Sequence, residues 1–273
     1  MQIAWFHVIF NVVTTACLLP FISQLIKLSN FFIKDKAVET ETRTFRYVDD
    51  RFLKTPAIAM MQVKKEIEYM GQLAMQNIAA SFKALEGNVD AFVPAIAENE
   101  ETIDFTNKAL TRYLIKLSSL VDASEEKSIG SYFHVLNDLE RIGDHAENFG
   151  EIATEMQGKG LTFSENARAE LKDMQDKIIR MFEIAQKAFD DGESTPLAEL
   201  TALENEVDDL KRTLTAKHYA RLAEGNCKVE LSPYFSSYVT GLERVADHLV
   251  NVGYSILNPT GSQSEAKAAL QKN

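Results

Sequence analysis

The chain has 273 residues, of which 45% are hydrophobic and 25% charged, enough for one large domain or two small ones. Its formal net charge of -11 at pH 7 repels phosphate backbones and argues against nucleic acid as a partner. The two cysteines, Cys17 and Cys227, form no CxxC pair, so neither a disulfide framework nor a thiolate zinc site is indicated.

The first element in chain order is an apolar run over residues 3–26, IAWFHVIFNVVTTACLLPFISQLI, which carries no fixed charge. About 20 apolar residues span a bilayer as a helix, so the run predicts a transmembrane helix within residues 1–33. A signal peptide is disfavoured because no basic residue precedes the run, and a buried soluble helix is the other alternative. His7 and Asn11 interrupt the run, and polar side chains in a membrane helix normally face protein or water. The basic residues that follow place residues 34–273 in the cytoplasm by the positive-inside rule.

Residues 34–54 are expected to be a linker, and after them apolar residues recur three and four positions apart, as in amphipathic helices. Short breaks with turn-forming residues separate these periodic stretches. Six helices are therefore predicted, followed by a flexible tail over residues 259–273. The predicted helices cover residues 56–85, 98–121, 125–157, 163–189, 196–223 and 230–257.

The chain contains an internal repeat. Residues 139–150, LERIGDHAENFG, and residues 242–253, LERVADHLVNVG, are identical at seven of twelve positions. Upstream, Glu100-x-x-Ile103-Asp104 matches Glu204-x-x-Val207-Asp208 at nearly the same spacing. We therefore expect an all-α fold of two tandem three-helix bundles, residues 55–158 and 159–258, preceded by one transmembrane helix.

The repeated phrase places acidic and amide side chains on one helix face. The series Glu140, Asp144, Asn148 and the series Glu243, Asp247, Asn251 each have a spacing of four residues. This strip lies nearly opposite the leucine-containing apolar stripe of the same helix.

Two interpretations of this strip remain open. It is either a solvated face with local ion pairs, such as Arg141 with Asp144 and Arg244 with Asp247, or part of a cation site. Oxygen ligands from several helices suit magnesium, manganese, ferrous iron or zinc. His145 and His248 point about 100° away from the strip, so we expect surface or interhelical hydrogen-bonding roles for them. Additional candidate ligands, which flank apolar stripes, are Glu100, Asp104, Glu204 and Asp208.

Enzymatic motifs are absent from the sequence. It has no HExxH, no Glu-x-x-His ferritin-like pair, no P-loop, no GxGxxG and no GxSxG. Nothing nominates a nucleophile with a base, so we expect no enzymatic activity.

Two three-helix units that each carry E-x-x-x-D in the third helix resemble the PhoU family. The paired E-x-x-[IV]-D segments resemble it too, and the likeness covers roughly residues 50–258. The resemblance implies a helical regulator of phosphate uptake and phosphate signalling that binds iron or zinc clusters, or other divalent ions, through these motifs. The metal-site residues that it supports are Glu140, Asp144, Glu243, Asp247, Asn148 and Asn251.

The N-terminal run carries a second resemblance. His7-x-x-Phe10-Asn11, followed by Leu-Pro-Phe at 19–21, is similar to the last membrane helix of bacterial sodium/phosphate cotransporter-like proteins. Some of those proteins carry a PhoU-like domain after that helix, and DDRFLKTPAIAMMQV at 49–63 resembles their junction. This implies a bacterial inner-membrane location. It also implies a partner that is a membrane-embedded phosphate transporter or the chain's own missing transport core. Phosphate-signalling proteins and a second copy of the chain are further candidate partners.

Three functional hypotheses follow. The first is a membrane-tethered regulatory domain that modulates phosphate transport or homeostasis. The second is the C-terminal part of a sodium/phosphate cotransporter, because the sequence has one candidate membrane helix and none of the paired Gln-Ser-rich motifs of transport cores. The third is a helical module that binds a partner through its acidic faces without metal.

Overall fold

The computed structural model describes residues 2–22, 43–255 and 257. The chain divides into two compact units, Met1–Thr44 and Phe45–Asn273. The predicted tail, residues 34–42 of the predicted linker and residues 23–33 of the predicted membrane segment lie outside the described residues.

The first unit contains α1 (Gln2–Leu18), followed by the 3-10 turn η1 (Leu19–Phe21), which has a proline in its first turn. Its large apolar side chains from Trp5 to Ile22 are largely exposed, and so are His7 and Asn11. Within the described part of the chain, no helix combines the length and the apolar character that crossing a bilayer requires. The transmembrane helix therefore stays a prediction.

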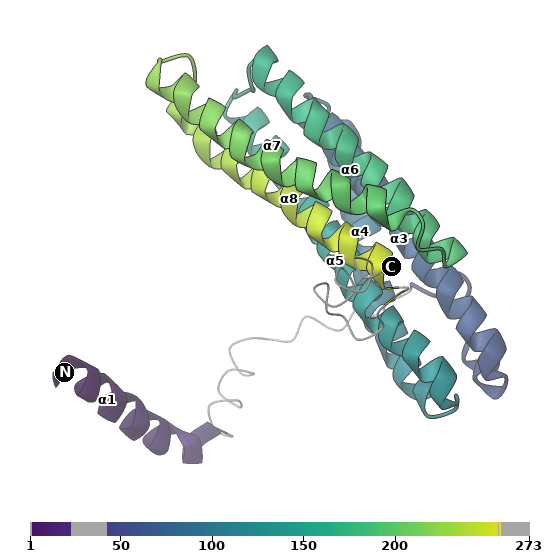
Figure 1. Ribbon diagram of the computed structural model, residues 1–273. Coiled ribbons are helices and arrows are strands. Elements are labelled where there is room, and N and C mark those ends of the chain that lie inside the picture. The colour runs from purple at the N-terminus through teal and green to yellow at the C-terminus, as the bar shows by residue number, and fades with distance from the viewer. Residues whose placement is uncertain (1, 23–42, 256, 258–273) are drawn as a thin grey trace. The chain divides into compact units, whose positions relative to one another are not determined.

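The second unit is built from six long helices and two 3-10 turns, and its described residues confirm the predicted all-α class (Figure 1). Helices α3, α4 and α5 contact one another, as do α6, α7 and α8. The two three-helix groups meet through α5 with α8 and through α3 with α6. The bounds are η2 (Asp50–Lys54), α3 (Pro56–Leu85), α4 (Val89–Ser118), α5 (Ala123–Gly158), α6 (Glu165–Asp191), α7 (Leu197–Ala223), η3 (Val229–Leu231) and α8 (Ser232–Tyr254).

The start of α4 corrects the sequence prediction. A break was expected near residues 97–99 after Pro94, but the helix begins at Val89 and runs through the proline. A proline inside a helix removes one backbone hydrogen bond. Burial of apolar side chains offsets that loss. A row of apolar residues at seven-residue spacing continues along α4 past Pro94, on the helix face opposite this exposed proline. The row consists of Val89, Ile96, Ile103, Leu110 and Leu117, each at most 6% exposed. The bounds of the other five helices lie within a few residues of their predictions.

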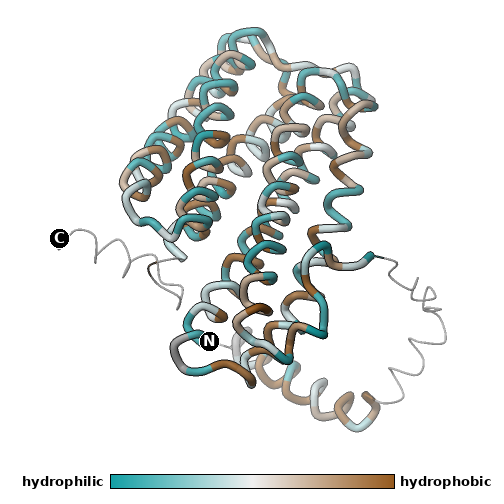
Figure 2. Tube along the Cα trace, turned by 90° about the vertical axis from the view of Figure 1, so that its right-hand side faces the viewer, coloured by the Kyte–Doolittle hydropathy of each residue, from teal (hydrophilic) through white to brown (hydrophobic). Residues whose placement is uncertain are grey.

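Hydrophobic residues line the inner faces of the helices, and hydrophilic residues predominate on the outer faces (Figure 2). The α5–α8 contact joins the two groups through Phe149 and Tyr238, whose ring centroids are 4.7 Å apart. Gly241 allows this approach, since a Cβ there would lie 2.5 Å from the Phe149 ring. Gln175 of α6 donates a 2.7 Å hydrogen bond to the buried Tyr238 hydroxyl, so its polar end is satisfied.

The segment before α3 is held on the second unit by a buried carboxylate. Glu66 of α3 is 1% exposed and accepts hydrogen bonds from the backbone N–H groups of Arg46, Tyr47 and Val48 at 3.2, 2.7 and 3.3 Å. The hydroxyl of Tyr113 of α4 donates to the carbonyl of Asp49 at 3.2 Å. Residues 46–49 therefore lie fixed against α3 and α4.

Candidate functional site

The first acidic cluster lies where α4 meets α5. Glu100 and Asp104 come from α4, and Glu140 and Asp144 come from α5, so the structure brings together the four carboxyl groups that the sequence nominates in repeat 1. Burial raises the pKa of Glu140 and of Asp144, and the negative charge of Asp144 raises the pKa of Glu140 further. Asp104 acts on both in the same direction. The arrangement is an accumulation of negative charge at a helix–helix contact.

Glu100 is the most buried member of this cluster, with 7% of the residue exposed. Both carboxyl oxygens are buried and accept no hydrogen bond from any described residue. Burial raises the pKa of Glu100 to about 8, and the charges of Asp144, Glu147, Asp104 and Glu140 contribute in the same direction. A buried polar group without a partner is costly, so this side chain calls for a proton or a cation.

The position of Glu100 depends on a glycine of the repeated phrase. A Cβ at Gly143 of α5 would lie 2.4 Å from Oε2 of Glu100 and 3.1 Å from its Cδ. With any other residue at this position the Glu100 side chain would have to move, so glycine lets this carboxyl group lie between α4 and α5.

The second acidic cluster lies where α7 meets α8. Its members are Glu204 and Asp208 of α7 and Glu243 and Asp247 of α8. Burial raises the pKa of Asp247, and Glu243, Asp208 and Glu204 repel its negative charge as well. Here a cation is present, because Nζ of Lys211 lies 3.0 Å from Oε1 of Glu243.

An arginine lies beside each motif, as the ion-pair interpretation predicted. Nη1 of Arg141 is 3.6 Å from Oδ2 of Asp144, and Nη1 of Arg244 is 3.8 Å from Oδ2 of Asp247. Both arginine side chains are more than 60% exposed, so these pairs are solvent-screened and contribute little.

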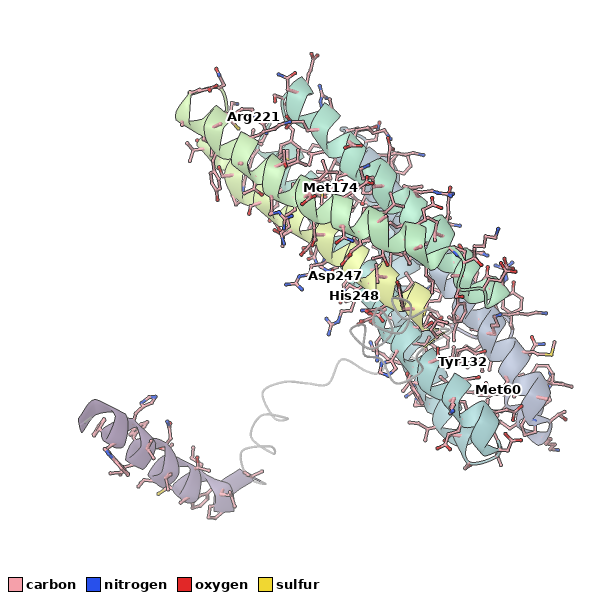
Figure 3. The ribbon with its side chains drawn as sticks, viewed as in Figure 1. Met60, Tyr132, Met174, Arg221, Asp247 and His248 are labelled. Carbon is pink, nitrogen blue, oxygen red and sulfur yellow. The ribbon has the colours of Figure 1, made fainter. Side chains whose placement is uncertain are left out.

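Other residues of the phrase connect α5 to α8. Nδ1 of His248 lies 2.8 Å from Oδ1 of Asp138, which also accepts a 3.1 Å hydrogen bond from the amide of Asn251. Figure 3 shows His248 directly after Asp247 on α8. The His145 and His248 rings are 6.1 Å apart, and burial together with the charge of His248 lowers the pKa of His145 to about 4. The interhelical role expected for the histidines is therefore observed for His248.

The predicted ligands Asn148 and Asn251 make contacts with residues other than the clustered carboxylates. Asn148 lines an open hollow of about 540 Å³ with His145, Ser236 and Arg244. Asn251 bonds Asp138 instead. The four carboxylates of each cluster stay predicted metal ligands.

Among the described residues, no three histidine, cysteine, aspartate or glutamate side chains are placed to hold one metal ion. The chemistry of the first cluster nevertheless fits a cation: it offers carboxylate oxygens from two helices, and Glu100 has two unpartnered oxygens. The side chains of Asp104 and Asp144 are 44% and 40% exposed, so they have room to change rotamer.

Sequence reasoning missed three residues that shape these sites: Gly143, Lys211 and Asp138. A glycine inside a strongly periodic helix signals a close approach, and the Gly143–Ala246 difference within the repeat was visible in the sequence. Asp138 and Lys211 lie on helices whose packing partners periodicity does not identify.

A family model described as PhoU domain matches residues 67–153 and again residues 171–256, which together exceed half of the chain. The chain belongs to the PhoU family. Its two matches each contain one acidic cluster, and membership makes it a regulatory protein related to phosphate transport, not an enzyme. The predicted PhoU resemblance and tandem organisation are confirmed.

Two kinds of relatives match this PhoU chain. YjbB of Salmonella typhimurium, a proposed inorganic phosphate export protein, is 22% identical over 267 residues, which cover 96% of this chain and 49% of YjbB. YjbB of Escherichia coli is 23% identical over 93% of this chain and 47% of its own length. The PhoU homolog 1 of Thermotoga maritima, a phosphate-specific transport system accessory protein, is 23% identical over 70% of this chain and 82% of its own. The chain thus spans about half the length of the YjbB relatives.

Solved structures show the same fold. The phosphate transport system regulatory protein PhoU from Streptococcus pneumoniae superposes with a TM-score of 0.66 at 17% identity, covering 74% of this chain and 95% of that one. PhoU from Pseudomonas aeruginosa gives a TM-score of 0.67 at 19% identity, covering 72% and 94%.

Proposed function

We propose that this PhoU protein is a membrane-tethered regulator of phosphate transport whose second unit faces the cytoplasm and acts on a membrane-embedded phosphate transporter. Its similarity to phosphate-specific transport accessory proteins and to YjbB supports this partner class. The large exposed apolar side chains of α1 support the tether, because such a surface is stable only against lipid or protein. The bacterial inner membrane is the proposed location.

We further propose that the regulator binds a divalent metal at the cluster between α4 and α5. The observation that carries this is Glu100, whose two buried oxygens accept no hydrogen bond from the described residues. Iron or zinc is the proposed metal, with magnesium and manganese as alternatives, and the residues that would hold it are Glu100, Asp104, Glu140 and Asp144. A bound cation would supply positive charge at the buried oxygens of Glu100, which accept no hydrogen bond from the described residues.

The metal would link binding to the arrangement of two helices. Asp104 lies on α4 and Glu140 and Asp144 lie on α5, so the repulsion between these carboxylates favours separation of the helices and a cation would favour their approach. The α5 helix also carries Asp138, which bonds His248 of the second repeat. Metal binding at the cluster would therefore affect the position of α5, which contacts both three-helix groups.

Phosphate flux in cells tests the regulatory proposal. The host cells lack their own gene for a PhoU protein. Cells that express the chain together with its transporter should show altered phosphate uptake or export compared with cells that express the transporter alone. Glu100→Gln/Asp144→Asn should remove that effect, and the exposed substitution Glu98→Gln should retain it. Equal flux with and without the chain would refute a regulatory role.

A second candidate function is that this chain is the C-terminal part of a phosphate exporter or cotransporter. It is supported by the share of YjbB that the chain spans, 49% and 47% in two species. Genomic sequence upstream of Met1 tests it: an in-frame extension that encodes further membrane helices would support this candidate. The metal-independent interaction module is distinguished by a chelator, which should leave its partner binding unchanged.

A further inference from the structure

The two acidic clusters match in their carboxylates but differ at a position in the neighbouring helix. Glu100 in α4 corresponds to Glu204 in α7 in the internal repeat. Seven residues after each, two turns along the same helix face, stand Asn107 in α4 and Lys211 in α7. One repeat therefore has an amide where the other has a positive charge.

A second difference lies inside the repeated phrase itself. Gly143 in α5 corresponds to Ala246 in α8, which is 1% exposed. The absence of a side chain at Gly143 leaves the space that the Glu100 carboxyl group occupies. In the second repeat Ala246 carries a methyl group at the matching position, and Glu204 is half-buried where Glu100 is buried.

The second cluster contains its own cation. Nζ of Lys211 lies 3.0 Å from Oε1 of Glu243, and these side chains are 31% and 15% exposed. This partly buried ion pair is less screened by solvent than a pair between two exposed side chains. Lys211 therefore offsets the charge of Glu243 at Oε1, whereas Oε2 is buried and accepts no hydrogen bond from the described residues.

The ion pairs among the described residues of the first cluster are longer or more exposed: Nε of Arg141 lies 3.8 Å from Oε2 of Glu140, which corresponds to Glu243. Asn107 carries no charge, and Nζ of the next residue, Lys108, lies 2.8 Å from Oδ2 of Asp104. These two side chains are 62% and 44% exposed, so they form a rim pair of the kind that contributes little. Both oxygens of Glu100 remain buried and accept no hydrogen bond from the described residues.

We infer that the two repeats use different cations: the α4–α5 cluster takes a divalent metal ion from solution, and the ammonium of Lys211 takes the place of a metal in the α7–α8 cluster. The inference rests on the proposed metal binding and adds that the two motifs are not equivalent. Metal occupancy would then report on one three-helix group only, while the other carries a cation of its own.

Metal content of the 273-residue chain in detergent tests the inference. The protein is stripped with chelator, equilibrated with ferrous iron or zinc, desalted and analysed for metal by mass spectrometry. Glu100→Gln should remove most of the metal, and Glu243→Gln should leave it unchanged. Asn107→Lys should reduce metal to the Glu100→Gln level, and Lys211→Asn should raise it about two-fold because the second cluster then needs an external cation.

Two controls separate charge placement from general effects. Lys177→Asn removes another largely buried lysine, whose Nζ lies 2.6 Å from Oε2 of Glu206 outside the clusters. Ser118→Lys adds a lysine at the exposed C-terminal residue of α4. Both should bind as much metal as the wild type. Circular dichroism at 222 nm verifies that every variant is folded.

The outcomes distinguish this inference from the proposed function on which it rests. No metal in the wild type or in Lys211→Asn would refute metal binding, and the inference with it. Metal in the wild type that Glu243→Gln lowers as much as Glu100→Gln would overturn the inference and leave metal binding intact. Unchanged metal in Asn107→Lys and in Lys211→Asn, both folded, would overturn it in the same way.

Discussion

Replacement of Glu100 by glutamine in the metal-free protein should raise its stability near neutral pH. The side chain is 7% exposed, has no hydrogen-bond partner among the described residues and has a pKa raised from 4.5 to about 8. The folded protein therefore holds a proton on Glu100 at pH 7, whereas the unfolded chain releases it. Glutamine has nearly the same shape and has no proton to lose.

The sign and size follow from linkage between protonation and folding. Between pH 4.5 and about 8 the folded state binds one more proton at Glu100 than the unfolded state does, so stability falls as pH rises. The slope is at most about 1.4 kcal/mol per pH unit. Summed from pH 4.5, the loss in free energy of unfolding is about 3 kcal/mol at pH 7 and about 5 kcal/mol at pH 8. Glu100→Gln should remove this slope and gain stability of that order.

Urea denaturation followed by circular dichroism, in chelator and at several pH values from 5 to 8, measures this. The exposed substitution Glu98→Gln on the same helix is the control and should leave the pH dependence unchanged. With saturating metal the order should reverse, because the ion stabilises only the protein that binds it. A variant with the same pH slope as the wild type in chelator would show that the Glu100 carboxyl group is not held in a protonating environment.

Two further substitutions test the packing around this region. Gly143→Ala should displace the Glu100 carboxyl group, because the new Cβ would lie 2.4 Å from its Oε2, and should therefore flatten the pH dependence of the free energy of unfolding in chelator. Gly150→Ala, whose Cβ would meet nothing closer than 3.6 Å, should keep the wild-type pH dependence. An unchanged pH dependence in Gly143→Ala would contradict the close approach. Glu66→Ala should speed amide hydrogen exchange at residues 46–48, because it removes the three hydrogen bonds that these N–H groups donate. Lys65→Ala, on the exposed face of the same helix, should leave the exchange unchanged. Unchanged exchange in Glu66→Ala would contradict the attachment of residues 46–48 to α3.

The sequence was a good guide to the helices because their apolar residues are periodic over many turns. The one substantial error was the start of α4, where Pro94 was interpreted as a break. Its cost is outweighed by the buried row that includes Val89 and Ile96, and that balance depends on packing partners which local patterns do not identify.

The site was only partly accessible from sequence for the same reason. Spacing within one helix placed Glu140 and Asp144 together correctly. Glu100 was ranked only as an additional candidate, although the structure makes it the most buried member of the cluster. Its burial is decided by a glycine on another helix, Gly143, and the neutralisation of Glu243 is decided by Lys211 on another helix again.

The three hydrogen bonds to Glu66 fix the stretch before α3, so this stretch cannot act as a flexible linker. An extended peptide spans at most about 3.3–3.6 Å per residue, so residues 45–54 as a flexible linker would have a length of up to about 35 Å. Because residues 46–48 are held by Glu66 and Asp49 by Tyr113, this stretch contributes no slack. A force applied to the chain at residue 45 therefore acts directly on α3.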